Sequence, residues 1–291
     1  MPRSYGRVVT TPAGARGVRE VRPVVSLTTD FGLRDPSAAI CKAVVLGIAP
    51  DALVVDITHE VEKYAIRDGA LMLWCALPYL PIGAHVAVVD PGVGTDRMPI
   101  AIETHRGDVL IGPDNGILLP GADRLGGIVR AHLVESHEYR LPQVSRSFHG
   151  RDIFSPAAAH VALGVPIEAL GREIDARRLV PLDWPEPEPH EGMLVSAVIY
   201  VDTFGNVKLA GEPADLETAL GPLEPGAPLR VDADEIRPFD AVWAETFGRV
   251  AEGQTLVYED SYGRLCLALN RGNLAAASGL QADARIAIRR A

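Results

Sequence analysis

Asp90 stands at the end of an apolar run and is followed by residues that turn the chain. The run His85–Val89 is rich in β-branched residues and predicts a buried strand, after which Gly92 and Gly94 favour a turn. Polar groups at the carboxyl end of such a strand lie where open α/β sheets bind ligands. A carboxylate in this place can accept a proton from water, and Arg97 follows one loop later. The stretch therefore predicts a site for acid–base chemistry.

The residues after Asp90 begin like a dinucleotide-binding fingerprint, but two features argue against that interpretation. Arg97 stands where the third glycine of the Gly-x-Gly-x-x-Gly pattern belongs. The stretch Met98–Thr104 predicts another strand, whereas the fingerprint needs a helix N-terminus for the pyrophosphate. A nucleotide cofactor is therefore disfavoured.

A metal centre is the other enzyme class to weigh, because Asp30, His59, Asp90 and His149 can all bind metals. Neither His-x-x-x-His nor His-Glu-x-x-His spacing occurs, and His149 and His160 are too far apart for one helix face. We therefore expect no metal and no resident cofactor.

The segments around these residues alternate between strand and helix patterns. Val24–Thr29 and Leu53–Ile57 predict strands, and the apolar faces that follow Asp35 and cover Ala65–Leu77 predict helices. With the strand before Asp90, this order predicts a parallel sheet with crossover helices. Each predicted strand ends in polar residues that share one sheet edge: Asp30, Thr58, His59 and Asp90.

Two more polar turns lie further along the chain. Val109–Ile111 predicts a strand that ends in the turn 112–116, and residues 147–152 precede a helix predicted over Ile153–Leu163.

The pattern changes beyond a proline-rich, acidic stretch at 179–192, which is typical of a linker. Short predicted strands follow it: Met193–Val201, Val207–Leu209, Leu229–Val231, Thr255–Tyr258, Leu265–Leu269 and Arg285–Ile288. We expect a flexible tail (1–22), an α/β domain with a mostly parallel sheet (23–185) and a barrel-like all-β domain (186–291).

The composition is that of a soluble globular protein, with 47% hydrophobic and 23% charged residues among 291. A net charge of −10 argues against a nucleic-acid partner. No apolar run approaches the ~18 residues of a membrane span, and residues 1–22 lack the apolar core of a signal peptide. Cys41, Cys75 and Cys266 lie in apolar contexts, which predicts buried thiols and a cytoplasmic protein.

Seven segments, in this order, resemble one enzyme family. They read LTTDFGLRDPS (27–37), DITHEV (56–61), VVDPGVGTDR (88–97), GPDNG (112–116), SFHGRDIFSPAAAH (147–160), DTFGN (202–206) and SYGRLCLALNRGN (261–273). The family is the S-adenosyl-L-methionine (SAM) hydroxide adenosyltransferases, adenosine-forming hydrolases related to fluorinases and chlorinases. The resemblance implies an α/β domain before a β-barrel, and a homotrimer with sites between the N-terminal domain of one subunit and the C-terminal domain of the next. SAM is the implied substrate, and adenosine and methionine are the implied products.

The resemblance also implies roles for individual residues. Asp90, Arg97 and His149 match the residues that position or activate the attacking water, and Asp30 matches the aspartate that holds the ribose hydroxyls. The other implied substrate contacts are Asp35 and Ser37 near the methionine end, Tyr64 over the ribose, Asp202 and Ser261 at the methionine amino and carboxylate groups, Phe204 and Asn206 at the adenine, and Arg271 by its backbone at the adenine edge.

Two alternatives remain. One is a SAM-dependent halogenase, and the other is a non-catalytic protein that binds SAM or adenosine. The halogenating enzymes resemble one another in carrying a tyrosine at the place of Asp90 and a threonine at that of Val93, and fluorinating enzymes carry a halide-binding serine at the place of Gly150. A carboxylate facing the reaction centre repels a halide and favours water, so we expect hydrolysis.

Overall fold

The computed structural model describes residues 22–234 and 236–291, which divide into two compact units at Asp183/Trp184. Of the predicted tail (1–22), only Arg22 belongs to the described residues. Its Nε donates a hydrogen bond to the carbonyl oxygen of Asp51 at 3.0 Å. Within the described part of the chain, no helix combines the length and apolar character needed to cross a membrane.

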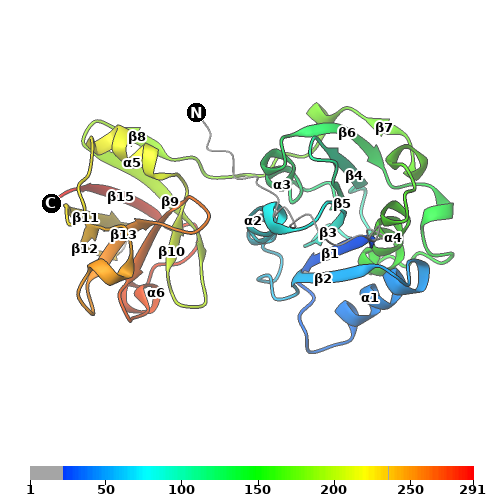
Figure 1. The fold of residues 1–291 in the computed structure, drawn as a ribbon, viewed down its shortest axis with the longest axis horizontal. Helices are drawn as coiled ribbons and strands as arrows, with labels where there is room; N and C mark the ends of the chain where they lie inside the picture. The colour runs from blue at the N-terminus through cyan, green and yellow to red at the C-terminus, as the bar shows by residue number, and fades with distance from the viewer. Residues whose placement is uncertain (1–21, 235) are drawn as a thin grey trace, which may run out of the picture. The chain divides into compact units, whose positions relative to one another are not determined.

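Unit 1 is built on one seven-stranded sheet with the order β2-β1-β3-β5-β4-β6-β7 (Figure 1). The strands are β1 (Val24–Thr29), β2 (Leu53–Thr58), β3 (Ala84–Val88), β4 (Pro99–Thr104), β5 (Val109–Pro113), β6 (Ile128–Leu133) and β7 (Glu173–Ile174). Strands β2, β1, β3 and β5 run parallel, as predicted. Strand β4 is antiparallel to β5 and β6, and β6 is antiparallel to β7. The short link between β4 and β5 permits a hairpin but no crossover, which explains the antiparallel part.

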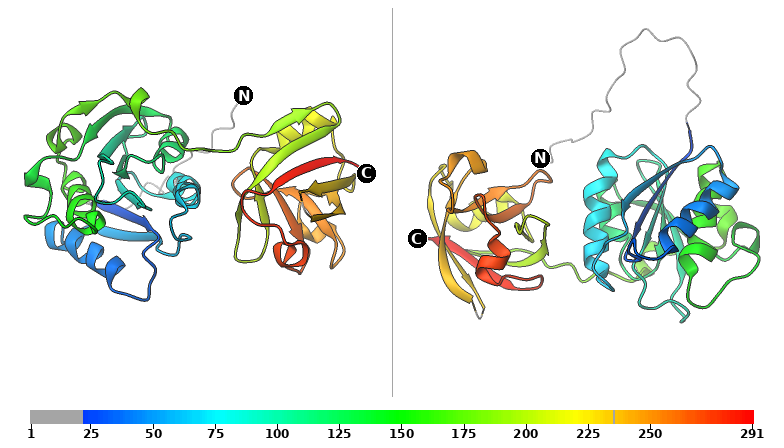
Figure 2. Two further views of the ribbon diagram at one scale, coloured as in Figure 1. Left: turned by 180° about the vertical axis from the view of Figure 1, so that it is seen from behind. Right: turned by 90° about the horizontal axis from the view of Figure 1, so that it is seen from below.

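Helices cover both faces of this sheet, which confirms the α/β class (Figure 2). They are α1 (Ser37–Ile48), α2 (Ile66–Ala76), α3 (Leu119–Arg124) and α4 (Ser155–Ala162). A π-helical turn, η3 (Gly150–Phe154), precedes α4, so the helical segment begins earlier than predicted. Short 3₁₀ turns are η1 (Leu77–Tyr79), η2 (His137–Tyr139), η4 (Ile167–Leu170) and η5 (Ala176–Arg178).

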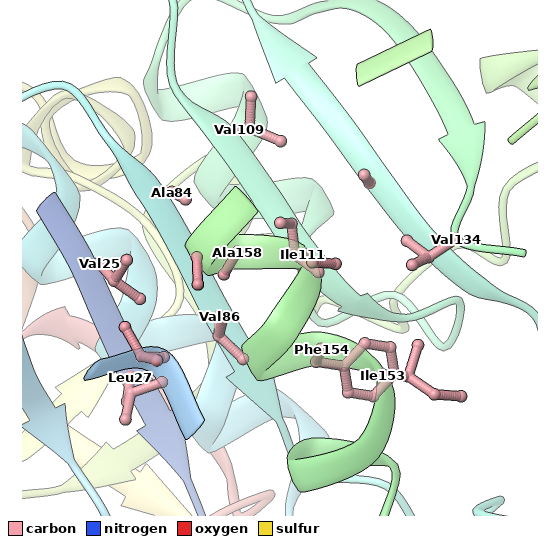
Figure 3. Packing of buried hydrophobic residues seen from close by; sticks show 14 of the residues in the cluster. Val25, Leu27, Ala84, Val86, Val109, Ile111, Val134, Ile153, Phe154 and Ala158 are labelled. Atoms are coloured by element: carbon pink, nitrogen blue, oxygen red, sulfur yellow. The ribbon is translucent and has the colours of Figure 1, made fainter. Parts of the chain in front are cut away.

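One hydrophobic cluster of unit 1 lies between the sheet and the helices α1 and α4. Leu27, Val86 and Ile111 project from neighbouring parallel strands and pack with Phe154 and Ala158 from the segment that follows His149 (Figure 3). All five side chains are almost completely buried. Because η3 and α4 are held by this core, the residue at their start is held in place as well.

Unit 2 is a closed β-barrel of seven strands, in agreement with the predicted barrel-like domain. The ring is β10-β14-β13-β12-β11-β15-β9, closed by the pairing of β9 with β10, and β8 adds to β9 outside the ring. The strands are β8 (Glu188–His190), β9 (Met193–Val201), β10 (Val207–Leu209), β11 (Pro228–Ala233), β12 (Ile236–Trp243), β13 (Thr255–Glu259), β14 (Leu265–Leu269) and β15 (Arg285–Arg290). The helices are α5 (Pro213–Leu220) and α6 (Leu274–Ser278), with a 3₁₀ turn η6 (Phe247–Arg249).

Five of these elements are absent from the sequence-based expectation: β8, β12, α5, α6 and η6. Strand β8 lies in the predicted linker, because Glu188–His190 pairs with the start of β9. Strand β12 has mixed polar and apolar residues and was not predicted, although it pairs with β11 on one side and β13 on the other. Helix α5 begins with a capping box between Glu212 and Asp215, a local signal that the sequence analysis did not use.

Candidate active site

Asp90, Arg97 and His149 converge on one point at the carboxyl end of β3. Arg97 Nε donates to Asp90 Oδ1 at 3.1 Å, and Arg97 Nη2 donates to Asp90 Oδ2. The same Nη2 lies 2.9 Å from His149 Nδ1. The side chains of Arg97 and Asp90 are only 7% and 5% exposed, so this is a buried, bidentate ion pair.

The contact with Arg97 determines which nitrogen of His149 carries the proton. A guanidinium can only donate hydrogen bonds, so Nδ1 accepts and the proton of the neutral ring is on Nε2. Burial and the positive charge of Arg97 lower the pKa of His149, against a smaller opposing effect of Asp90. The neutral ring therefore presents Nε2–H as a donor, while Asp90 offers acceptor oxygens.

Arg97 retains hydrogen-bonding capacity beyond these contacts. Its Nη1 is buried and has no hydrogen-bond partner among the described residues. Its Cζ lies 5.4 Å from the centre of the Phe154 ring, which packs against the guanidinium. A buried donor of this kind is suited to an oxygen ligand, because burying it without a partner costs about 1–3 kcal/mol.

The loop between Asp90 and Arg97 is shaped by close backbone packing. Gly94 has φ +78°, and a Cβ there would lie 2.3 Å from the carbonyl oxygen of Arg146, so a side chain cannot be accommodated. Asn115 Nδ2 donates to the carbonyl oxygen of Val89 at 2.9 Å, directly before Asp90. The sequence analysis noted the turn that contains Asn115 but assigned it no role; its position after a strand was the available signal.

Asp114, the neighbour of Asn115, is a second carboxyl group near Arg97. It accepts a hydrogen bond from the Val180 amide at 2.9 Å, and its own amide donates to the carbonyl oxygen of Met98. Burial raises the pKa of Asp114, although the Val180 amide and the charge of Arg97 act in the opposite direction. The turn 112–116 therefore holds both ends of the loop that carries Arg97.

His149 is placed by the π-helical turn that follows it and by aromatic packing. The rings of Phe31 and Phe148 meet edge to face, with centroids 5.6 Å apart. A Cβ on Gly150 would lie 2.9 Å from Phe31 Cζ, so a serine at this place requires Phe31 to move. π-Helical turns are frequent at functional sites, which fits the position of η3 beside His149.

Asp30 and Tyr64 are also brought together in unit 1. Asp30 is 8% exposed at the end of β1, and its Oδ2 accepts a hydrogen bond from the Tyr64 amide at 3.1 Å. Tyr64 has φ +66°, a strained conformation for a bulky residue, and its side chain is 71% exposed. Strain of this kind clusters at ligand sites, so the arrangement supports a role for both residues in binding.

Asp35 and Ser37 pair with each other at the start of α1. Asp35 Oδ1 accepts a hydrogen bond from the Ser37 amide at 3.0 Å, and hydrogen bonds from the Ser37 side chain and amide lower the pKa of Asp35. Asp35 is exposed, so it satisfies a free amide of the helix and still presents a charge to solvent.

In unit 2, Asp202 organises the turn that carries Phe204 and Asn206. Its Oδ1 accepts the amide hydrogens of Phe204 and Asn206 at 2.9 and 3.0 Å, and its Oδ2 accepts Asn206 Nδ2 at 2.9 Å. The side-chain amide of Asn206 thus donates a hydrogen bond to the Asp202 carboxylate in this structure. The Phe204 ring is 76% exposed and is free to stack on a ligand.

Ser261 lies exposed in a second turn, which is held by a buried ion pair. Asp260 Oδ1 accepts the amide hydrogens of Tyr262 and Arg264 at 2.8 and 3.0 Å, and Lys208 Nζ donates to Asp260 Oδ2 at 2.6 Å. Burial lowers the pKa of Lys208, but the hydrogen bond to Asp260 together with the nearby charges, which include Asp260 and Asp202, outweighs burial and raises it. The sequence analysis missed Lys208; a lysine inside the apolar run of β10 was the signal.

Arg271, the remaining predicted contact, has φ +57° and an exposed side chain whose Nη1 lies 3.0 Å from Glu252 Oε2. The predicted residues thus form one group in unit 1 and another in unit 2. Over residues 22–234 and 236–291, no group of three or more His, Cys, Asp or Glu side chains is arranged to hold a metal ion.

Two family models match the chain. The model of the SAM hydroxide adenosyltransferase N-terminal domain covers residues 25–171, and that of the C-terminal domain covers residues 196–287. A protein from Salinispora tropica named (R)-S-adenosyl-L-methionine hydrolase is 41% identical over 91% of this chain and 97% of its own. A protein of the same name from Thermus thermophilus is 40% identical over 90% of this chain and 97% of its own. A fluorinase from Nocardia brasiliensis is 29% identical over 92% of this chain and 97% of its own.

Solved structures show the same architecture. A conserved protein from Thermotoga maritima matches with a TM-score of 0.85 at 33% identity, covering 92% of this chain and 100% of that one. A conserved hypothetical protein from Thermus thermophilus matches with a TM-score of 0.70 at 35% identity, covering 93% and 100%.

Proposed function

Because the chain belongs to the SAM hydroxide adenosyltransferase family, we propose that it is an enzyme that hydrolyses SAM to adenosine and L-methionine. Relatives that are 35–42% identical carry the name SAM hydrolase. The observation that carries the proposal is the buried cluster of Asp90, Arg97 and His149, which combines an acceptor, a fixed cation and a neutral donor within one set of hydrogen bonds.

The proposed reaction is an in-line displacement at C5′ of the adenosyl group. A water oxygen forms the new bond to C5′ as the C5′–S bond breaks. The electron pair of the C5′–S bond stays on sulfur, so methionine leaves as a neutral thioether. The leaving group needs no acid, so catalysis consists of holding the water and removing its proton. Orientation can supply several kcal/mol, and a positioned base adds about 10²–10⁴-fold.

We propose distinct tasks for the three residues, and their hydrogen bonds support these tasks. Asp90 accepts a proton of the water, and the Nε2–H of neutral His149 donates to its oxygen. Arg97 holds the Asp90 carboxylate in place and donates to Nδ1 of His149, which keeps that nitrogen unprotonated. Its unpartnered Nη1 is a further donor for the water or for a substrate oxygen.

We propose the substrate contacts that the family resemblance implies. Asp30 holds the ribose hydroxyls, with Tyr64 beside it, and Asp35 and Ser37 lie near the methionine end. In unit 2, the exposed ring of Phe204 stacks on the adenine. Asn206, Asp202, Ser261 and Arg271 complete the proposed set of substrate contacts.

The names of the relatives specify the R configuration of the substrate, and the sulfonium sulfur of SAM is stereogenic. We therefore propose that this chain also prefers the R epimer. Incubation with an epimer mixture, followed by chromatographic resolution of what remains, tests the preference: equal consumption of both epimers would contradict it.

Halogenation is the less favoured alternative. By the family resemblance, Asp90 puts a carboxylate at the reaction centre, which would repel a halide, and Gly150 has no room for the serine of fluorinating enzymes unless Phe31 moves. We also propose that the protein is a cytoplasmic homotrimer with sites between subunits. Light scattering on the purified protein measures the mass of the assembly and so tests the trimer.

The deciding experiment is incubation of the purified protein with SAM and chromatographic detection of the products. We expect equal amounts of adenosine and methionine, with or without halide and with or without a chelator. A 5′-halogenated nucleoside in chloride or fluoride would establish the halogenase. Binding of SAM without methionine release over hours would establish a non-catalytic binding protein.

A further inference from the structure

Four side chains form a continuous chain of hydrogen bonds beneath Asp30, which we name the strand-end relay: Thr29, His59, Asp56 and Lys42. Thr29 Oγ1 lies 2.8 Å from His59 Nδ1, and His59 Nε2 lies 3.1 Å from Asp56 Oδ1. Lys42 Nζ donates to Asp56 Oδ2 at 2.8 Å. His59 is 3% exposed and links the ends of the neighbouring strands β1 and β2.

The direction of each hydrogen bond follows from what each group can donate. The ionised Asp56 only accepts, so His59 Nε2 carries a proton and donates to it. In a neutral ring Nδ1 then accepts, and the hydroxyl of Thr29 donates its single proton to that nitrogen. The hydroxyl oxygen remains an acceptor, and it takes the Phe31 amide hydrogen at 3.2 Å.

The relay therefore fixes the backbone on both sides of Asp30. Thr29 precedes Asp30, and the Phe31 amide follows it and bonds Thr29 Oγ1. One residue further, the Gly32 amide donates to the carbonyl oxygen of His59 at 2.6 Å. The imidazole of His59 therefore acts on this turn through Thr29, and the backbone carbonyl of the same residue holds Gly32.

The same turn contacts the segment that carries His149. Phe31 packs edge to face on Phe148, the neighbour of His149, and lies against Gly150. A displacement of the turn would be transmitted to that packing, although less directly than to Asp30.

We propose that His59 is a positioning residue for substrate binding, which acts through the Thr29 hydroxyl to place Asp30 against the ribose. This inference rests on the proposed function for the role of Asp30, but the relay itself does not. A histidine that only stabilised the fold would serve as well through its bond to Asp56 as through its bond to Thr29.

Two substitutions separate these bonds. In His59→Asn the side-chain amide takes the place of Nδ1 and keeps the link to Thr29, whereas in His59→Gln it takes the place of Nε2 and keeps the link to Asp56. Each variant loses one of two hydrogen bonds, so we expect similar losses in melting temperature. We expect His59→Gln to raise the KM for SAM and the Kd for adenosine about tenfold, as loss of one hydrogen bond predicts, with kcat changed less than about threefold. His59→Asn should stay within about threefold of wild type in all three.

The chain offers a matched control in His85. Its Nδ1 lies 2.8 Å from Ser26 Oγ, and its Nε2 lies 2.9 Å from Asp108 Oδ1, so it repeats the hydroxyl–His–Asp pattern with a hydroxyl from the same strand β1. His85 is fully buried and lies near the start of β3, away from the strand end. We expect His85→Gln to lower the melting temperature while KM and the adenosine Kd stay unchanged.

The inference fails if His59→Gln leaves KM and the adenosine Kd unchanged, if both His59 variants raise them equally, or if His85→Gln raises them as much. Absence of SAM turnover in the wild type would instead defeat the proposed function, and adenosine affinity measured by calorimetry would still decide the role of His59.

Discussion

Arg97–Asp90 in unit 1 and Lys208–Asp260 in unit 2 are both buried ion pairs, with exposed side-chain fractions of 7% and 5% against 11% and 3%. The two pairs differ in the further hydrogen bonds that their carboxylates and cations make. Asp260 accepts Lys208 and two backbone amides, so its capacity is used within its own turn. Over the part of the chain that the structure describes, the Asp90 side chain accepts hydrogen bonds from Arg97 alone, and Arg97 keeps a buried nitrogen without a partner.

This difference is the one that the proposed function requires between a pair used in catalysis and a pair used for support. Burying charges costs free energy that only good geometry and further hydrogen bonds offset. In unit 2 these bonds come from the protein, which makes the pair a scaffold for the Ser261 turn. In unit 1 part of the capacity is left for a bound molecule. Four predictions test this contrast, from the largest effect to the smallest.

Arg97→Ala removes the cation that holds Asp90 and His149. We expect kcat for SAM to fall about 10²–10⁴-fold, the range for loss of a positioned base, with a smaller change in KM. Steady-state kinetics with adenosine detection measure both. Arg177→Ala is the matched control, because Arg177 makes a comparable two-nitrogen pair with Asp175 on the surface. Equal losses in kcat and in binding for Arg97→Ala would show that the pair is structural, as in unit 2.

Lys208→Met leaves Asp260 buried without its cation. We expect the free energy of unfolding to fall by about 3–5 kcal/mol, as for other broken buried pairs, and KM to rise because the Ser261 turn loosens. Chemical denaturation followed by circular dichroism gives the stability. Arg230→Met breaks the more exposed pair with Asp240 and should cost less than about 1 kcal/mol. If Lys208→Met costs no more than Arg230→Met, the supporting role is wrong.

The pH dependence of kcat/KM reports the state of His149. Burial and Arg97 lower its pKa below 6.5, so the neutral ring persists as the pH falls through 6.5 and is lost only at lower pH. We expect kcat/KM to stay level from neutral pH down to about 6.5 and to fall below it. In Arg97→Gln the acid limb should move to higher pH, because the positive charge that lowers the pKa is gone. An unmoved limb would assign the titration to another group.

We expect the smallest effect at Asp68 in α2. Asp68 is a half-buried carboxyl group, and no cation near it outweighs the effect of burial on its pKa. Burial and repulsion by Glu62 raise its pKa to about 6, against an opposing effect of Arg67. A raised folded-state pKa means that its contribution to stability is full below about pH 4, the unfolded value, and is lost as the pH rises through 6. Asp68→Asn should therefore raise the melting temperature by about 2–4 °C at pH 7.5 and by less at pH 5. Differential scanning calorimetry at both pH values measures the change, and an equal shift at both would contradict the assignment.

Much of the fold was predictable because its signals are local. The strands before Asp30 and Asp90 are short, buried and rich in β-branched residues, and the barrel strands β9, β10 and β14 begin and end at the predicted residues. Strand β12 was not predicted because its polar and apolar residues do not alternate regularly. Helix α5 was not predicted because it is short. The antiparallel β4–β5 pairing was not expected either, because strand direction depends on how a connection folds and periodicity does not report it.

The sequence by itself determined the family, the order of the two folds and the identity of the polar residues at the strand ends, since these depend on local pattern and on motif order. Only the tertiary structure decided which of those residues pair. Arg97 reaches His149 across 52 positions, and Lys208 reaches Asp260 across the same separation. His59 finds Thr29 across 30. Such pairings arise when the fold brings together segments that are distant in sequence, and a residue's type carries no record of the segment that will lie beside it.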